Sequence, residues 1–368
     1  MSQQQSKQEQ VASAFDRTLD PLAEYDATFK QLNVDPHEMW LRDCVYNQEY
    51  AEGTVSAKKR HLKQWREFII SEHNRHPAVP TTQHVVDFAH HCVNKQDNQG
   101  STVAAKIQTL NLAFEYFQNQ SEYPQDEDFN PFDAPKQKLN LSDDDPDPPH
   151  QISVDELRRK IHEDIKHIRD RALIVTQLKL GIRASETANI KLCEIHIDNA
   201  ELQDHYEELG THPVLESRSN AVYIPPDRAL NKSDNPRVLP LDDELRRLLL
   251  QYLLCRPDNG KPWVFLSKSG GKQLDQDNIN HIWKNYFRPT YGPTDRFRGV
   301  SSHFGRHFFT TWFTVKQEWS RDDVSHMRGD KSGDGEVKSS QEAIDAYIHR
   351  WFEDIEDPYR QDIFKLRV

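Results

Sequence analysis

The segment from Ser301 to His307, which reads S-S-H-F-G-R-H, carries residues suited to phosphate chemistry. His303 and Arg306 lie three positions apart, so on a helix they share one face. Tyr347 follows in a polar context, D-A-Y-I-H. A guanidinium group holds two phosphate oxygens, and a phenol can attack phosphorus. Together the residues indicate phosphodiester chemistry, although an H-x-x-R pair alone is also typical of a solvated helix face.

Two motifs upstream add further cations. In L-G-I-R-A-S-E the glycine allows a tight turn that places Arg183 at the start of a helix. In N-K-S-D-N-P-R-V-L-P-L a polar turn between two short strands carries Lys232 on its rim. Taken singly, Arg183 beside Glu186 also fits a surface ion pair, Lys232 a solvated turn, and Tyr347 an ordinary amphipathic tyrosine. The phosphate hypothesis therefore depends on all of them occurring together.

The elements that must position these residues are mostly helices. Apolar residues recur at helical spacing between 54 and 117, and the segment S-D-D-D-P-D-P-P then reads as a stiff, self-repelling linker. We expect a mainly α protein whose second domain holds a small antiparallel sheet. The expected parts are a partly helical N-terminal extension (1–53), a helical DNA-binding bundle (54–140), an acidic, proline-rich linker (141–150), a catalytic domain (151–355) and a C-terminal tail (356–368).

The net charge of −12 argues at first against a nucleic-acid partner, but its distribution removes the objection. Residues 1–53 and 121–149 carry −6 and −7, so the remaining parts are near neutral or slightly basic. DNA binding needs a local basic face rather than a basic average. The first helix of the bundle offers one, which fits a solvated face and a phosphate-tracking face equally well. Its basic residues, our candidates for DNA contact, are Lys58, Lys59, Arg60, Lys63 and Arg66.

Composition narrows the class of protein further. No apolar run approaches the length of a membrane span, and the N-terminus lacks the apolar core of a signal peptide. The four cysteines are far apart, match no metal spacing and read as reduced, isolated thiols. We expect a cytoplasmic, nucleoid-associated protein with no membrane contact.

In this order the motifs resemble those of the tyrosine recombinase (phage integrase) family. That family's boxes typically read T-G-L-R-x-S-E-L, G-K-G-x-x-x-R-x-V-P-L, H-x-L-R-H-x-F-A-T and E-x-Y-x-H. Here they read L-G-I-R-A-S-E-T, N-K-S-D-N-P-R-V-L-P-L, H-F-G-R-H-F-F-T-T and D-A-Y-I-H. The resemblance covers about residues 54–355. It implies a SAM-like core-binding bundle followed by an α-rich catalytic domain.

The resemblance also implies a role for each candidate. Arg183 and Arg306 would grip the non-bridging oxygens of the scissile phosphate and stabilise its pentacoordinate transition state. Tyr347 would attack phosphorus, giving a 3′-phosphotyrosyl link and a free 5′-hydroxyl. Lys232 would protonate the departing 5′-oxygen, and His303 would assist the phenol's proton or a phosphate oxygen. Neither a nucleotide cofactor nor a metal is then needed.

One position departs from the family pattern. The family usually has L-G-H, or tryptophan for that histidine, shortly before the tyrosine, whereas this chain has M-R-G-D and then an insertion, K-S-G-D-G-E-V-K. Asp330 therefore occupies the His/Trp position, where it could accept a hydrogen bond from Tyr347 or orient an arginine, but it also brings negative charge towards a phosphate. His326 is the alternative substitute. His307 is expected to support the fold or contact the phosphate.

These features favour a site-specific recombinase acting on double-stranded DNA, clamped by both domains, as a homo-tetramer on paired sites. The N-terminal extension and the insertion favour the integrase of a mobile element. An Xer-like resolvase of chromosome or plasmid dimers is the alternative within the family. The alternative of another class is a DNA-binding protein with a decayed active site, for which Asp330 is the support. The tail after Trp351 is expected to dock on a neighbouring protomer.

Overall fold

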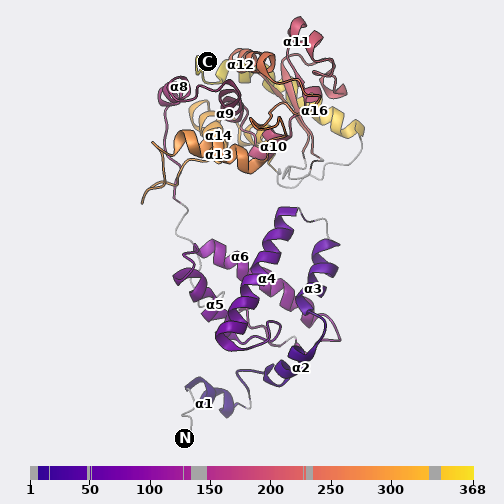
Figure 1. The fold of residues 1–368 in the computed structure, drawn as a ribbon, viewed down its shortest axis with the longest axis vertical. Helices are drawn as coiled ribbons and strands as arrows, with labels where there is room; N and C mark the ends of the chain where they lie inside the picture. The colour runs from indigo at the N-terminus through magenta and orange to yellow at the C-terminus, as the bar shows by residue number, and fades with distance from the viewer. Residues whose placement is uncertain are drawn as a thin grey trace. The chain divides into compact units, whose positions relative to one another are not determined.

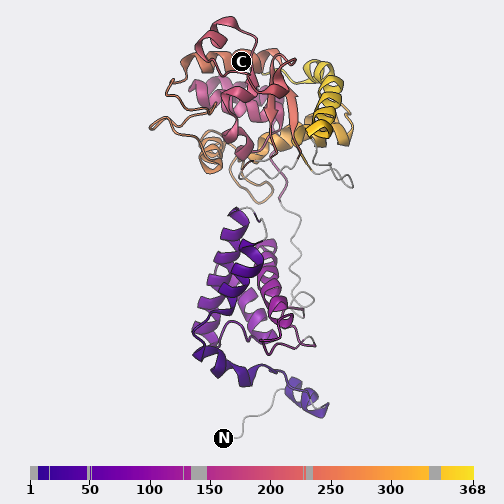
Figure 2. The same cartoon turned by 90° about the vertical axis from the view of Figure 1, so that its right-hand side faces the viewer.

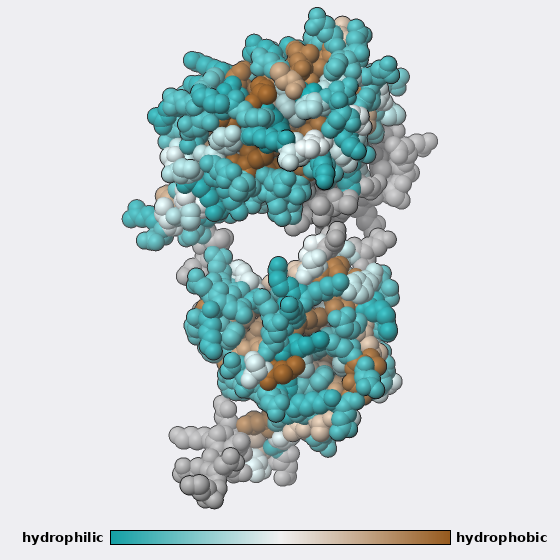
Figure 3. All heavy atoms as spheres, viewed as in Figure 1, coloured by the Kyte–Doolittle hydropathy of each residue, from teal (hydrophilic) through white to brown (hydrophobic). Residues whose placement is uncertain are grey.

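The computed structural model describes residues 7–15, 17–47, 50, 52–126, 128–133, 147–226, 228, 235–330 and 341–368. The chain splits into two compact units, Met1–Pro146 and Asp147–Val368 (Figures 1 and 2). Each unit has its own apolar core, and the surface seen in Figure 3 is largely hydrophilic on both. Within the described residues no helix is long and apolar enough to cross a membrane. The expected mainly α fold with a small antiparallel sheet is confirmed.

The N-terminal unit is built around three long helices. Thr81 caps the second of them, accepting a hydrogen bond from the backbone N–H of His84. Trp65 is fully buried between the helices and packs edge-on against Phe88, with ring centroids 5.2 Å apart. The helices are α1 (Lys7–Ala14), η1 (Ala23–Tyr25), α2 (Asp26–Gln31), α3 (Pro36–Trp40), the π-helix η2 (Leu41–Tyr46), α4 (Glu52–His73), α5 (Thr82–Asn94) and α6 (Gly100–Gln118).

The residues before position 54 differ from the expected separate extension. Phe29 and Trp40 are buried in the same core as Trp65 and Phe117. An ion pair between Arg75 and Asp20, at 2.8 Å, ties this segment to the end of α4. The described part of residues 17–47 is therefore a structural component of the bundle. Periodicity missed this because short helices carry too few turns to show it.

The C-terminal unit is built around two helices that pack closely against each other, α9 (Ile168–Leu180) and α14 (His303–Thr311). Gly305 of α14 lies so close to α9 that a Cβ would meet the backbone of Gln177 at 3.2 Å. The buried indole N–H of Trp283 donates to Oε1 of Gln177 at 2.6 Å. The helices are α8 (Val154–Glu163), α9 (Ile168–Leu180), α10 (Ala184–Asn189), η3 (Leu192–Glu194), α11 (Ala200–His205), η4 (Pro213–Leu215), α12 (Asp243–Cys255), α13 (Gln276–Phe287), α14 (His303–Thr311), the π-helix η5 (Trp312–Lys316), α15 (Arg321–Arg328) and α16 (Gln341–Asp362).

The small sheet has three antiparallel strands in the order β1-β2-β3. Strands β2 (Ala221–Ile224) and β3 (Arg237–Pro240) were predicted, and they pair with Val222 opposite Leu239. The sequence did not indicate β1 (Ile195–His196), which is only two residues long. All residues of β2 and β3 are buried, because the sheet packs on both faces, and so the strands show continuous rather than alternating hydrophobicity.

The C-terminal segment corrects the expectation of a tail that docks on a neighbour. Helix α16 continues to Asp362, and Tyr359, Phe364 and Leu366 are buried in the core of their own unit. Lys179, also fully buried, donates to Asp242 at 2.7 Å and to the carbonyl of Phe364 at 3.1 Å. Residues 356–368 are therefore part of the C-terminal unit, fastened by a buried cation.

Candidate active site

Arg183 is positioned by the turn between α9 and α10. Gly181 ends α9 with φ of +63°, and an added Cβ would lie 2.6 Å from the ring of Phe309, so glycine is needed for both the turn and the packing. Arg183 is the N-cap residue of α10, and its backbone N–H donates to Glu186 Oε2 at 2.7 Å. Glu186, which is fully buried, therefore braces the backbone of Arg183 and does not form the surface ion pair that the motif alone also fits.

Glu186 also holds a second arginine that the sequence analysis did not assign. The Nη2 atom of Arg237, on β3, lies 2.9 Å from Glu186 Oε1, and both side chains are inaccessible to solvent. The Nε–H of Arg237 donates to the carbonyl of Met327 at 2.9 Å. This buried pair joins the first motif to the sheet and to α15. The only sequence signal for it was the arginine in N-K-S-D-N-P-R.

Arg306 reaches the same place from α14 and is 4% exposed. Its Nη1 atom donates to the carbonyl of Gly181 at 3.0 Å and to that of Arg328 at 2.7 Å. Burial, together with the positive charges of Arg328 and Arg183, lowers the pKa of Arg306 to about 9. The guanidinium is thus still cationic at neutral pH, in surroundings that favour an added anion.

Asp330 lies where the two predicted phosphate-binding arginines meet. Its Oδ1 atom accepts from Nη2 of Arg183 at 3.0 Å and from Nη2 of Arg306. Its Oδ2 atom pairs with Arg328 Nη2 at 3.1 Å. Of the roles expected for Asp330, contact with arginine is present, whereas the hydrogen bond from Tyr347 would involve a side chain outside the described residues.

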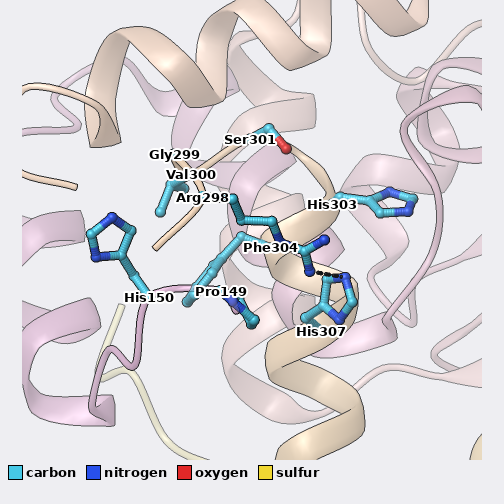
Figure 4. A pocket seen from close by; sticks show the side chains of 9 residues that line it. All are labelled: Pro149, His150, Arg298, Gly299, Val300, Ser301, His303, Phe304 and His307. Atoms are coloured by element: carbon cyan, nitrogen blue, oxygen red, sulfur yellow. Dashed lines mark hydrogen bonds between the residues drawn. The ribbon is translucent and has the colours of Figure 1, made fainter. Parts of the chain in front are cut away.

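The two histidines of α14 lie beside this cluster. Burial and the charge of Arg306 lower the pKa of His303, and burial and the charge of Arg298 lower that of His307 to about 4. Both rings are therefore neutral at pH 7. Figure 4 shows the hydrogen bond between Arg298 and His307, while His303, at the start of the same helix, has its ring apart from this pair.

Two hollows open on His303. One, of about 210 Å³, is also lined by His150, Arg298 and His307 (Figure 4). The other, of about 250 Å³, is also lined by Arg183 and by the first turn of α13. His303 therefore lies between the arginine of the first motif and a second basic group, Arg298, which the sequence analysis did not identify.

His326, the alternative substitute at the His/Trp position, is buried at 5% exposure. Burial and the charge of Arg237 lower its pKa to about 3, so it stays neutral within α15. The group that contacts Arg183 and Arg306 is Asp330 instead.

Two predicted catalytic residues are not covered by this geometry. Lys232 lies outside the described residues, between β2 and β3. Tyr347 lies on α16, and only the backbone of this part of the helix is described. Their roles remain predictions. No group of three or more His, Cys, Asp or Glu in the described part of the chain could hold a metal ion.

The predicted DNA-binding residues of α4 fall into two groups. Lys58 is buried, with its ammonium 5.4 Å from the ring centroid of Trp40, and Arg66 forms an ion pair with Asp35. Lys59, Arg60 and Lys63 are exposed, although the Lys59 ammonium lies 5.0 Å from the ring of Tyr46. Part of the basic run therefore serves the fold of the N-terminal unit.

Comparisons with known proteins agree on one family. The phage integrase family model matches residues 151–333. The tyrosine recombinase XerC of Staphylococcus carnosus (strain TM300) is 24% identical over 220 residues, which are 57% of this chain and 61% of that relative. The chain thus spans less than two thirds of the length of this curated relative. It belongs to the phage integrase, or tyrosine recombinase, family.

Solved structures show the same fold at low sequence identity. A lambda integrase dimer bound to a COC′ core site matches with a TM-score of 0.59 and 12% identity, covering 97% of this chain and 82% of that one. A lambda integrase tetramer bound to a Holliday junction matches equally well, covering 90% and 88%. The Tn1549 transposon integrase bound to transposon right end DNA matches with a TM-score of 0.58 and 12% identity, covering 86% and 99%.

Proposed function

We propose that the chain is a site-specific DNA recombinase that cleaves and rejoins DNA through a 3′-phosphotyrosyl intermediate. The observation that carries the proposal is the convergence of Arg183 and Arg306 on one carboxylate oxygen, Oδ1 of Asp330. The three residues come from separate segments of the chain, and family membership supports the same reading. An anion held by two guanidinium groups is the arrangement that a scissile phosphate requires.

The proposed cleavage step needs no reagent other than the protein and its DNA. The phenol oxygen of Tyr347 attacks phosphorus, and the bond from phosphorus to the 5′-oxygen breaks. The phenol proton passes to His303, whose neutral ring can accept it, and Lys232 donates a proton to the leaving 5′-oxygen. Arg183 and Arg306 stabilise the charge on the non-bridging oxygens. Because the phosphotyrosine conserves the energy of the broken bond, no nucleotide cofactor is needed, and because two arginines and a lysine compensate the charge, no metal is needed either.

Binding of duplex DNA would involve the N-terminal unit as well as the C-terminal unit, and the two would clamp the double helix. On α4 the exposed cations Lys59, Arg60 and Lys63 are available to phosphates, while the cation Arg298 and the neutral ring of His307, which are hydrogen-bonded to each other, lie beside the reacting phosphate. We place the protein in the cytoplasm on chromosomal DNA, as a homo-tetramer on paired sites. The likeness to a lambda integrase tetramer on a Holliday junction supports this assembly.

Within the family we propose the integrase of a mobile element rather than an Xer-like resolvase. The insertion K-S-G-D-G-E-V-K between Asp330 and Tyr347 supports this choice. The product distinguishes the two: an integrase joins two different sites, whereas a resolvase separates two copies of one site. Incubating the protein with paired sites from the ends of the element and sequencing the joints would decide.

The test of the chemistry is a duplex that carries a nick near the cleavage point, taken from sequences flanking the gene. Loss of the short nicked fragment traps the covalent protein–DNA adduct. Wild type should form the adduct and Tyr347→Phe should not. DNA binding by both proteins without any adduct would instead support a DNA-binding protein with a decayed active site.

A further inference from the structure

The carboxylate of Asp330 is shared by three guanidinium groups. Oδ1 contacts Arg183 and Arg306, and Oδ2 contacts Arg328, whose Nη2 lies 3.1 Å away. The side chains of Asp330 and Arg328 are 27% and 26% exposed, so the group opens to solvent on this side. Arg328 lies in the M-R-G-D segment, but it was not among the predicted site residues.

The donors that Asp330 occupies are those that a phosphate would need. Both Nη1 contacts of Arg306 are made to backbone carbonyls, those of Gly181 and Arg328. The Nη1 atom of Arg183 lies near Gly329 and Glu186, 3.5 Å from each. The Nη2 atom of each arginine is therefore the one turned to the carboxylate. A phosphodiester, which also presents two oxygens sharing one negative charge, would compete for these same atoms.

The cluster also carries more positive than negative charge among the described residues. Among the described residues three guanidinium groups contact Asp330, while Glu186 is shared between the buried Arg237 and Nη1 of Arg183, so four guanidinium groups meet two carboxylates. The Nε–H of Arg328 is shielded from solvent and has no hydrogen-bond partner in the described part of the chain. An unsatisfied buried donor is costly, so an incoming acceptor would be favoured.

We propose that Arg328 is a third phosphate-binding arginine, and that Asp330 is an internal anion which the scissile phosphate displaces from the three guanidinium groups. The inference rests on the proposed function and deepens it. Asp330 keeps the cluster ordered and partly neutralised without DNA. Its displacement leaves three positive charges for the transition state, in which a second negative charge develops on the phosphoryl oxygens.

The test uses the full chain and inorganic phosphate as the probe, read as the phosphate dependence of the melting temperature. Asp330→Asn removes the competing charge at nearly constant shape and should lower the half-saturating phosphate concentration about tenfold. Arg328→Gln added to Asp330→Asn should reverse most of that gain. The matched control is Asp243→Asn, which removes the same charge from an exposed acid that pairs with Arg246. It should leave phosphate binding unchanged.

Two results would overturn the inference. If Asp330→Asn binds phosphate no better than wild type, Asp330 does not compete for the site. If the double variant binds as well as Asp330→Asn, then Arg328 is not a phosphate ligand. Should Asp330→Asn unfold without phosphate, recovery of its melting transition at millimolar phosphate supports displacement, and lack of recovery contradicts it. Asp330→His, which removes the same charge, is the second variant.

These outcomes are separate from those of the proposed function. Phosphate binding does not require Tyr347, so the displacement of Asp330 can fail while the nicked duplex still yields a covalent adduct. Conversely, a protein that forms no adduct can still show tighter phosphate binding in Asp330→Asn. The first result removes only this inference, and the second removes the recombinase proposal.

Discussion

Two basic regions of this chain differ in how their charges are assembled. The basic residues of α4 lie close together in the sequence. Two of them nevertheless make contacts within the N-terminal unit: the Lys58 ammonium lies over the ring of Trp40, and Arg66 forms an ion pair with Asp35. The arginines of the C-terminal unit come from three separate segments and meet at Asp330. Neighbouring charges need no special fold, whereas assembling distant like charges costs free energy. The second arrangement is therefore the stronger indication of an anion site.

The largest effect should come from removing an arginine at the convergence point. Arg306→Ala should slow formation of the covalent adduct by about 10²–10³, because the transition state loses one of its charged donors. Single-turnover cleavage of the nicked duplex measures this rate. Arg246→Ala, at an exposed ion pair of α12, is the control and should cleave at the wild-type rate. Equal rates for both variants would mean that Arg306 only supports the fold.

Next in size is the cost of breaking the buried pair beneath the site. Glu186→Gln leaves Arg237 buried and unpaired, and should reduce the free energy of unfolding by about 3–5 kcal/mol. Urea denaturation of the full chain measures the loss. The double variant Glu186→Gln with Arg237→Met should regain part of it. A double variant less stable than the single one would show that the pair is not a unit.

Acid should destabilise the bundle through its buried histidines. Burial lowers the pKa of His61 to about 4, and the ring is 2.9 Å from the hydroxyl of Thr109. Its folded pKa lies below the unfolded value near 6.5, so the unfolded state binds the proton first, and stability falls as pH drops from 6.5 to 4. Each such histidine contributes at most about 1.4 kcal/mol per pH unit. Urea midpoints at pH 7, 5.5 and 4.5 should show a shallower decline for His61→Gln than for wild type. An equal decline would show that His61 does not carry the effect.

The smallest effects should separate the two kinds of lysine on α4. Lys63→Ala removes an exposed cation and should reduce the slope of log K against log salt for duplex DNA by about 0.9. Lys58→Ala should leave that slope unchanged and lower the melting temperature instead, because it empties a buried position against Trp40. Fluorescence anisotropy at several salt concentrations and a thermal melt make the comparison. A reduced slope for Lys58→Ala would contradict the internal role.

Local patterns in the sequence predicted much of this structure. The glycine that ends α9 and the two strands around the Lys232 turn depend on neighbouring residues, and both features lie where they were expected. The positions of Arg183 and Arg306 at one site followed from the family motifs. The structure added what the motifs do not encode.

The missed features depend on contacts between distant segments. Nothing near Arg237 in the sequence shows that it meets Glu186, an acid from another segment, and nothing near Arg328 shows that it joins Arg183 and Arg306 at Asp330. Lys58 looked like a surface cation because the aromatic rings that cover it precede α4. The segment from 356 to 368 looked like a free tail because the buried Lys179 that fastens it lies on α9.

The most direct test of the account is the identity of the residue that becomes linked to DNA. Trypsin should release Ser339–Arg350, whose single tyrosine is Tyr347, from the adduct formed on a nicked duplex. After nuclease digestion, mass spectrometry should find a nucleotide phosphate on that peptide in wild type and none in Tyr347→Phe. A nucleotide on any other residue, or a wild-type adduct that persists in Tyr347→Phe, would contradict the account.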